Sequence, residues 1–371
     1  MTIITRMTSF GANNWIARPL SNVGTGLARS RMVFKPVVPA AGKTTAEKTT
    51  TSHDTINVMT YNILAQKYAQ SGWHNYCPSR HIRWDYRKAL LLEELEAYCS
   101  DIICLQEVEA EVFSRELQPW LAERGYQGHY LARHHGENVQ RLLLAAVTHL
   151  FWNPAFPDVK SFQAAVLCQE MATFLQRHAR GGNGSGPAGG GGVVEVPVEE
   201  VPVVLAGDFN SLSHKRVPDV FDPKIPRGPD GLVSGVYTLL TRGSLPTDHP
   251  DHPASRRRLG ETSNLDFRGL DLTTAGLRLA SAYCLANGRE PPLTTRTATF
   301  AGCLDYIFVS PQHFDVTSTL DFPYDLPLGS YDTVRDPLSD VKFPPIPNGA
   351  FPSDHLSLVA LLKFKRSDDG M

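Results

Sequence analysis

Several features are scarce in this sequence of 371 residues, and each scarcity narrows the class of protein. No apolar run approaches the roughly 18 to 20 residues that a membrane-spanning helix needs, so we expect no membrane partner. The six cysteines show no CxxC spacing, and most lie in apolar runs, which indicates buried free thiols in a reducing compartment. The net charge is only −2, so a nucleic-acid partner requires a local basic surface.

Acidic residues are absent from the first 46 residues, where Arg and Lys lie among Ser, Thr and Gly. This composition is typical of an organellar transit peptide and equally of a disordered tail, and it lacks the long apolar core of a secretory signal. We therefore expect residues 1–53 to be a disordered leader or a transit peptide. We expect a cytoplasmic protein, with a mitochondrion or plastid as the alternative compartment.

A globular pattern begins near residue 56, and 42% of the chain is hydrophobic, which suits one large α/β domain over residues 54–366 before a short tail at 367–371. The predicted strands are 56–62, 101–107, 141–150, 202–208, 303–310 and 356–364, and the predicted helices are 84–98, 109–124 and 158–178. Residues 181–192 are rich in glycine and predict a flexible surface loop inside the domain. Residues 321–352 predict a second long loop.

Polar residues stand at or beside the ends of six predicted strands. They are Asn62, Glu107, His149, Asp208 with Asn210, Asp305, and Asp354 with His355. Strand ends at one edge of a layered α/β fold form a common crevice where ligands bind. A single polar residue after a strand is usually a turn or cap residue, but six such places together predict a shared site.

The carboxylates in this set suit a hard cation and an attacking water. Glu107, with Asp305 or Asp354, offers the oxygen ligands that Mg²⁺ prefers. Asp208 has the chemistry to polarise a water molecule, and Asn210 lies two residues further, on the same face of an extended chain.

The neutral and basic members of the set suit a phosphate. Asn62 and Asn210 offer a carbonyl to a metal or an amide donor to a phosphate oxygen, and His149 and His355 can donate to charge developing on phosphorus. The residue types together predict metal-assisted hydrolysis of a phosphodiester.

The ordered motifs carry a family resemblance. TYN, LQE, THLFW, GDFN, LDYIF and PSDH, in this order, resemble the exonuclease–endonuclease–phosphatase superfamily. Within it, TYNILAQKYA, HIRWDYRKALLLEEL, DIICLQEVE, THLFWNPAFPDVK, LAGDFNS and GCLDYIFVS resemble the carbon-catabolite-repressor-type deadenylases, whose relatives are Angel, nocturnin and the 2′,5′-phosphodiesterase. The similarity runs from about Asp54 to Phe364, with interruptions.

The resemblance implies a fold and a set of roles. The fold is a two-sheet α/β sandwich flanked by helices, with the site at one end. Mg²⁺, or Mn²⁺ in its place, would be held by Glu107 with Asn62 nearby, and the residue chemistry adds Asp354 as a further carboxylate. Asp208 would be the general base, Asn210 and His355 would contact the scissile phosphate, Asp305 would orient His355 or support the phosphate, and His149 would neutralise the developing oxyanion.

The resemblance also implies a pocket for adenine. In these deadenylases a Pro and a Phe hold the base, and the matching positions are Pro154 and Phe300, with Asn210 reaching the base edge. Stacking on flat apolar faces is the usual way of binding single-stranded bases. The alternative for Phe300 is an ordinary core aromatic.

Two departures from the family pattern stand out. Val147 occupies the position where relatives often carry an Asn two residues before His149. Between about residues 132 and 141 the chain also lacks several strands that the family has, which predicts a shortened sheet with a new edge. The leucine-rich repeats that begin some deadenylases, and dock a large complex, are absent from the sequence.

The sequence therefore predicts a Mg²⁺-dependent 3′→5′ exoribonuclease that hydrolyses single-stranded poly(A) RNA to 5′-AMP. One alternative is a nocturnin-like nucleotide phosphatase or a 2′,5′-oligoadenylate phosphodiesterase. Another is a catalytically weak RNA-binding or scaffold relative, because part of the sheet is missing.

Overall fold

A computed structural model describes residues 2–6, 34–36, 55–69, 72–130, 143–178, 197–223, 225, 231–257, 266–324 and 343–365. The Gly-rich segment 181–192, the short segment around 132–141 and most of the predicted long loop at 321–352 lie outside these residues. Within the described part, no helix is both long enough and apolar enough to cross a membrane.

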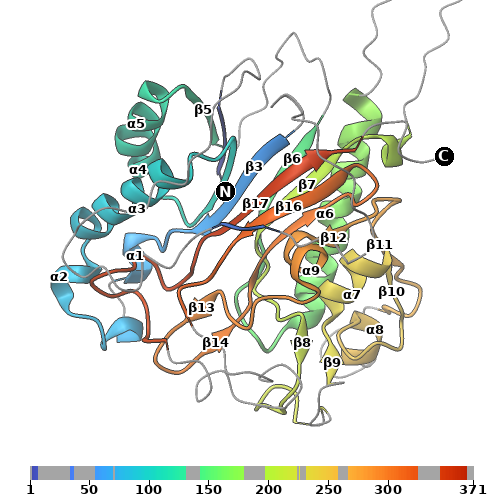
Figure 1. Cartoon of the computed structure of the whole chain (residues 1–371). Coiled ribbons are helices and arrows are strands. Elements are labelled where there is room, and N and C mark those ends of the chain that lie inside the picture. Colours follow the sequence, from blue (N-terminus) through green and yellow to red (C-terminus); the bar gives the residue numbers. More distant parts are fainter. Residues whose placement is uncertain are drawn as a thin grey trace, which may run out of the picture.

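The largest sheet has seven strands, and its only parallel pair is β3 with β4. In sheet order the strands are β2 (Phe34–Pro36), β16 (Phe314–Leu320), β17 (Leu358–Phe364), β3 (Thr55–Asn62), β4 (Ile102–Gln106), β1 (Thr2–Arg6) and β5 (Tyr126–Tyr130). The predicted strands near 56–62, 101–107 and 356–364 are thus β3, β4 and β17, which are neighbours in the order β17, β3, β4. Figure 1 shows β3 beside β17.

A second sheet has four strands and carries the remaining predicted ones. Its order is β12 (Ala280–Ser281), β15 (Asp305–Val309), β7 (Val203–Asp208) and β6 (Leu144–His149). Three two-stranded pairs complete the strands: β8 (His214–Lys215) with β9 (Leu232–Val233), β10 (Ser244–Leu245) with β11 (Leu272–Thr273), and β13 (Thr295–Arg296) with β14 (Ala301–Gly302).

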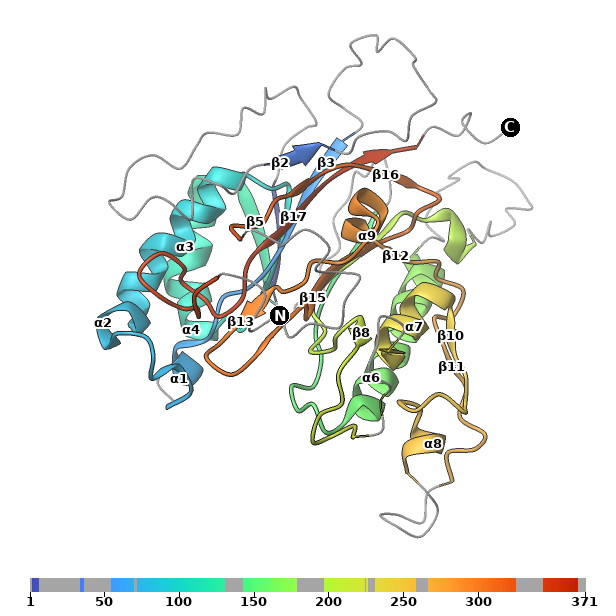
Figure 2. The ribbon, with the colours of Figure 1, turned by 60° about the horizontal axis from the view of Figure 1, so that its bottom comes forward.

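Helices cover the outer faces of the two sheets, as Figure 2 shows. Those beside the seven-stranded sheet are α1 (Gln66–Ala69), α2 (Ser79–Ile82), α3 (Trp84–Tyr98), α4 (Ala110–Val112) and α5 (Gln118–Glu123), with a π-helical turn at Phe113–Leu117 between the last two. Those beside the four-stranded sheet are α6 (Pro157–His178), α7 (Gly235–Arg242) and α8 (Pro253–Arg256), whereas α9 (Ala282–Asn287) lies between the two sheets, against β15 and β16. Single 3₁₀ turns lie at Gly72–His74 and Val198–Glu200.

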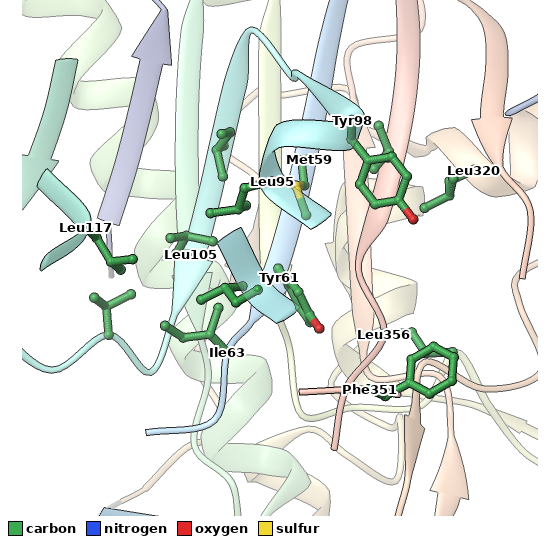
Figure 3. Close-up of a cluster of buried hydrophobic side chains, with 14 of the residues drawn as sticks. Met59, Tyr61, Ile63, Leu95, Tyr98, Leu105, Leu117, Leu320, Phe351 and Leu356 are labelled. Carbon is green, nitrogen blue, oxygen red and sulfur yellow. The ribbon is translucent and has the colours of Figure 1, made fainter. Parts of the chain in front are cut away.

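Three buried clusters hold these layers together. One packs Met59 and Tyr61 of β3 against Leu95 of α3 (Figure 3). A second lies between the sheets, and a third lies between the four-stranded sheet and helices α6 and α7. Because the central strands are buried on both faces, their sequences read as continuous apolar runs rather than as alternating ones. The structure is the two-sheet α/β sandwich that the sequence predicts.

Two short segments of the predicted 1–53 leader are strands. Thr2–Arg6 pairs with both β4 and β5, and Phe34–Pro36 pairs with β16. These two segments are therefore strands rather than disordered chain. In the first, β-branched residues at 3, 4 and 5 favour extended backbone. Cleavage of the leader stays a prediction.

One edge of the four-stranded sheet, in the part of the chain that the structure describes, is β6. In the described part of the chain, β6 pairs on one side only, with β7, and most of its residues are half-buried, whereas every residue of β7 is buried. In the other sheet, β4 is paired on both sides, with β3 and with β1. That this sheet is shortened relative to the family stays a prediction, because the segment around 132–141 lies outside the described residues.

Candidate active site

Strand register brings three of the predicted site residues into one row. Across β6, β7 and β15, His149 is the partner of Asp208 and Asp208 is the partner of Asp305. Each ends or begins its strand, so the row lies along the edge of the four-stranded sheet. In the facing sheet, Asn62 ends β3 beside Gln106, which ends β4 just before Glu107.

Asp208 is the point where the two sheets meet. Its carboxylate is almost fully buried, and its Oδ2 lies 3.1 Å from Asn62 Nδ2, 3.5 Å from His149 Nε2 and 3.7 Å from His355 Nε2. Its Oδ1 accepts a hydrogen bond from the backbone N–H of Asn210 at 2.8 Å. Burial raises the pKa of Asp208, against the opposing effect of His355. A more basic carboxylate is the better proton acceptor.

Asn62 bridges two carboxylates. Its Nδ2 donates to Glu107 Oε1 at 3.0 Å as well as to Asp208, while its Oδ1 accepts from the backbone N–H of Leu64. The amide nitrogen therefore faces the carboxylates, and the oxygen predicted to face a metal is already bonded. Glu107 Oε2 accepts from the backbone N–H of Ala65 at 3.0 Å. Glu107 is thus fixed at two points while remaining only half-buried.

His355 is held between carboxylates. Its Nδ1 lies 2.8 Å from Asp305 Oδ2, and Thr295 Oγ1 lies 3.0 Å from the same nitrogen. Burial alone would lower the pKa of His355, but the carboxylates of Asp305 and Asp208 outweigh it and raise the pKa well above its usual value. The ring is therefore a buried cation pointing its Nε2 toward Asp208.

Asp354 turns away from this group. Its Oδ2 lies 3.3 Å from His74 Nε2, and its Oδ1 lies 3.5 Å from Ser353 Oγ. Burial works against the charge, but the hydrogen bond from His74 prevails and lowers the pKa of Asp354. The predicted metal-ligand role of Asp354 stays a prediction.

Asn210 shapes the loop after β7. Its Nδ2 donates to the carbonyl of Leu150 at 3.1 Å, and its own carbonyl accepts from Lys160 Nζ at 2.6 Å. One amide hydrogen is thus committed to the loop after β6, which leaves the other for a substrate. The lysine comes from the first turn of α6 and is buried.

The two residues of the predicted base pocket lie in separate loops. Pro154 is exposed and lies in the connection between β6 and α6. Phe300 lies between β13 and β14 and is 37% exposed, so it is not a core aromatic. Its ring folds over Gly302, where Leu212 also packs, two residues beyond Asn210. Phe300 is therefore on the Asn210 side of the site.

Four supporting residues escaped sequence reasoning. Thr294 Oγ1 donates to Asp305 Oδ2 at 2.5 Å and accepts from the backbone N–H of Asp305. Thr295 contacts His355, His74 contacts Asp354, and Lys160 donates to the carbonyl of Asn210. Pairs of threonines are common in strands, so TTRT carried no signal. His74 lies 280 residues from its partner, so only the fold brings the two together.

The donor set suits a divalent cation that prefers oxygen. Ligand atoms of Asp208, Asp305 and His355 lie within 4.8 Å of one another, and Asp305 Oδ1 is buried with no hydrogen-bond partner in the described residues. Glu107 is not a member of this group, and its predicted role as the main metal ligand stays a prediction.

Comparison with known proteins agrees with this geometry. The model of the Endonuclease/Exonuclease/phosphatase family matches residues 59–355. Two curated relatives are named CCR4-Not complex 3′-5′-exoribonuclease subunit Ccr4: that of Mycosarcoma maydis is 26% identical over 86% of this chain and 52% of its own length, and that of Yarrowia lipolytica is 28% identical over 85% and 49%. The chain thus spans about half the length of these relatives.

A solved structure shares the fold. The crystal structure of ANGEL2, a 2′,3′-cyclic phosphatase, in complex with adenosine-2′,3′-vanadate superposes with a TM-score of 0.55 at 20% identity, covering 84% of this chain and 96% of that one. At that identity the likeness concerns the fold alone.

Proposed function

This chain belongs to the Endonuclease/Exonuclease/phosphatase family, and from that membership and its site we propose that it is a Mg²⁺-dependent 3′→5′ exoribonuclease. Its substrate in this proposal is single-stranded RNA ending in poly(A), and its product is 5′-AMP. The names of the curated relatives, 3′-5′-exoribonuclease subunits, support RNA as the substrate and the 3′→5′ direction of hydrolysis.

The observation that carries the proposal is the setting of Asp208. One buried carboxylate of raised pKa faces two imidazoles and an amide, and that amide also holds Glu107. A turn or capping aspartate needs none of these partners. A group that takes a proton from water beside a phosphate needs all of them.

In the proposed reaction each residue of the row has one task. Asp208 accepts the proton of the attacking water. His149 and His355 donate to the phosphate oxygens as negative charge grows there, and Asp305 keeps His355 protonated and oriented. Asn210 binds the phosphate with its remaining amide hydrogen, while Pro154 and Phe300 flank the terminal adenine.

Mg²⁺ in this proposal is held by Glu107, whose carboxylate is aligned by Asn62 and the Ala65 N–H. When bound, the ion supplies positive charge for the phosphate oxygens. Asn62 and Asp354 support the site from behind, through Asp208 and through His74.

The proposal is tested by incubating the purified chain with Mg²⁺ and, in parallel, A-tailed RNA, NADP and 2′,5′-oligoadenylate. We expect shortening of the A-tail from its 3′ end with release of 5′-AMP, and neither other substrate consumed at a comparable rate. Preferential hydrolysis of NADP or of the 2′,5′ linkage would assign the same site to a different substrate. RNA bound but left intact would identify a catalytically weak relative.

A further inference from the structure

We propose that Trp73 and Trp152 form a second base-binding subsite, which stacks a nucleobase of single-stranded RNA next to the one at the cleaved end. The inference rests on the proposed function, because it concerns the same bound RNA. Neither tryptophan takes part in the proposed reaction or in the proposed adenine pocket.

Both side chains are exposed and touch each other. Trp73 is 71% exposed and Trp152 is 57% exposed, yet their ring centroids lie 6.2 Å apart with an angle of 78° between the planes. Large aromatic side chains seldom remain this open on a folded surface unless they bind something. Two rings at nearly a right angle form a corner with one face available from each ring.

The corner spans the two halves of the sandwich at the edge that carries the site. Trp73 lies in the 3₁₀ turn that follows β3 and α1, and Trp152 lies in the loop that follows β6. These strands belong to different sheets. Figure 1 shows α1 and the β13–β14 pair at one end of the molecule, where β3 also ends.

Each tryptophan is tied to a site residue through its immediate neighbours. His74, next to Trp73, contacts Asp354, which directly precedes His355. Leu150, which lies between His149 and Trp152 in the chain, accepts a hydrogen bond from Asn210. The corner is therefore fixed at the rim of the group around Asp208, within reach of a nucleotide whose phosphate lies there.

The chemistry of the corner favours a nucleobase. Bases stack on flat aromatic faces without a need for sequence-specific hydrogen bonds, and a phosphate-binding site beside such faces is the usual arrangement for single-stranded nucleic acid. Phe151 packs beside Trp152 and Phe156 packs beside Phe151, so the loop side of the corner is supported from behind. On the other side, α1 presents the exposed Lys67, a cation suited to the RNA backbone.

The experiment that tests the inference is a double-mutant cycle, in which substitutions in the protein are combined with removal of one base from the RNA. The variants are Trp73→Ala, Trp152→Ala and the conservative Trp152→Phe. Phe174→Ala is the matched control, because Phe174 is 47% exposed but lies in the last turns of α6, about 25 Å along the helix from its start beside the site. Binding of fluorescein-labelled oligoadenylate of about 15 nucleotides is measured by anisotropy in EDTA, where hydrolysis cannot proceed, and again with one abasic position near the 3′ end.

We expect either Trp→Ala change to weaken binding by about 5- to 150-fold, the effect of losing one base-stacking contact. Trp152→Phe should retain most of the affinity, and Phe174→Ala all of it. One abasic position should weaken binding to the unsubstituted protein and have no further effect on the Trp→Ala variants.

Trp→Ala variants that bind the intact oligonucleotide as the unsubstituted protein does, with an unchanged melting temperature, would overturn the inference; so would an unsubstituted protein that binds no RNA. The proposed function fails by a separate readout: the unsubstituted protein binds the RNA but leaves it intact in Mg²⁺. A corner that serves a protein partner would give RNA binding indifferent to both tryptophans, which again overturns the inference.

Discussion

At the scale of single residues, the site contains two side chains on unusual backbone. Glu107 has φ of 58° and Asn210 has φ of 49°, in the left-handed region that costs most non-glycine residues about 1 kcal/mol or more. Glu107 directly follows β4, and Asn210 lies two residues after the end of β7. The turn aims Glu107 back at Asn62 and aims the Asn210 carbonyl at Lys160. Such strain persists where the surrounding structure holds it, as the bonds of both residues do here.

Glu107→Gln tests the metal assignment. The change keeps the shape of the side chain and removes the charge from the carboxylate proposed to hold the cation. We expect hydrolysis of A-tailed RNA in Mg²⁺ to fall about 100-fold or more, because neutral amide oxygen is a weaker Mg²⁺ ligand. The melting temperature should change little. A full rate in Mg²⁺ would show that the cation is held elsewhere.

Asp208→Asn separates binding from catalysis. Loss of a general base lowers turnover by about 10²- to 10⁴-fold, while binding of RNA should stay near normal or improve as a negative charge near the phosphate disappears. Single-turnover cleavage and anisotropy measure the two effects. Asp315→Asn is the control, since that carboxylate is 59% exposed on β16, away from the row of site residues. Preserved cleavage with weakened binding would indicate a loop-capping role.

Much of the site was predictable from strand ends, and the reason is geometric. A polar residue at the tip of a buried strand is placed by that strand, so Asp208, His149 and Asp305 meet once their strands pair. Asp354 was different, because its side chain contacts His74, which lies 280 residues away in the sequence. Residues that act through distant partners carry no local pattern.

At the scale of elements, the contact between β6 and β7 depends on one glycine. A Cβ on Gly207 would lie 2.0 Å from the carbonyl oxygen of Thr148, and the φ of Gly207 is 152°. Only a residue without a side chain lets the two strands approach so closely. Because Asp208 follows directly, the position of the proposed general base depends on this approach.

Gly207→Ala should therefore reduce both stability and activity. Relief of the clash requires the strands to separate, and we expect a loss of about 2 kcal/mol or more in the free energy of unfolding, measured with denaturant. Activity should fall in the protein that remains folded. Gly269→Ala is the control, because no atom lies within 4 Å of the added carbon. Equal stability of the two variants would contradict the close approach.

The first turn of α6 carries a pH-sensitive lysine. Burial, aided by Lys215, lowers the pKa of Lys160 to about 8. An unfolded chain keeps this pKa near 10.4, so between about pH 8 and pH 10.4 the unfolded state binds more protons. The free energy of unfolding contributed by this group therefore rises with pH across that window, and below pH 8 it remains a constant penalty.

Lys160→Met removes that dependence. The difference in unfolding free energy between the unsubstituted protein and the variant should shift by about 2 to 3 kcal/mol in favour of the unsubstituted protein between pH 7.5 and pH 10.5. Denaturant titrations at several pH values measure it. A difference that does not change with pH would mean that Lys160 titrates as in the unfolded chain.

Element prediction succeeded where burial is complete and failed where elements are short. The apolar runs of β4, β7 and β15 and the periodicity of α3 and α6 were sufficient to place them. β16 has a mixed sequence with a half-buried middle, which hid it. The two-residue strands β8 to β14 exist only because their neighbours pair with them, so their own sequences could not reveal them.

At the scale of the whole molecule, the seven-stranded sheet is completed by β1, a segment from near residue 1. β1 separates β4 from β5 and hydrogen-bonds to both. Without it, the backbone groups of β4 on that side would lack partners, and each buried unpaired group costs about 1 to 3 kcal/mol. A sequence predicted as a leader thus completes the sheet that bears Asn62 and Glu107.

Ile4→Pro tests this closure, because proline in a strand paired on both sides removes a donor and is not tolerated. We expect a fall of about 3 kcal/mol or more in unfolding free energy, whereas Ile4→Val should leave it nearly unchanged. A proline variant as stable as the unsubstituted protein would show that β1 contributes nothing to the fold.

The position of β1 also sets an order of events during synthesis. Thr2–Arg6 is made well before its partners Ile102–Gln106 and Tyr126–Tyr130. At the usual 5 to 20 residues per second, roughly 5 to 25 seconds separate the two ends of this contact on the ribosome. During that interval the nascent strand has an open edge and is accessible to chaperones. The sheet can then close only late, after β5 has left the exit tunnel.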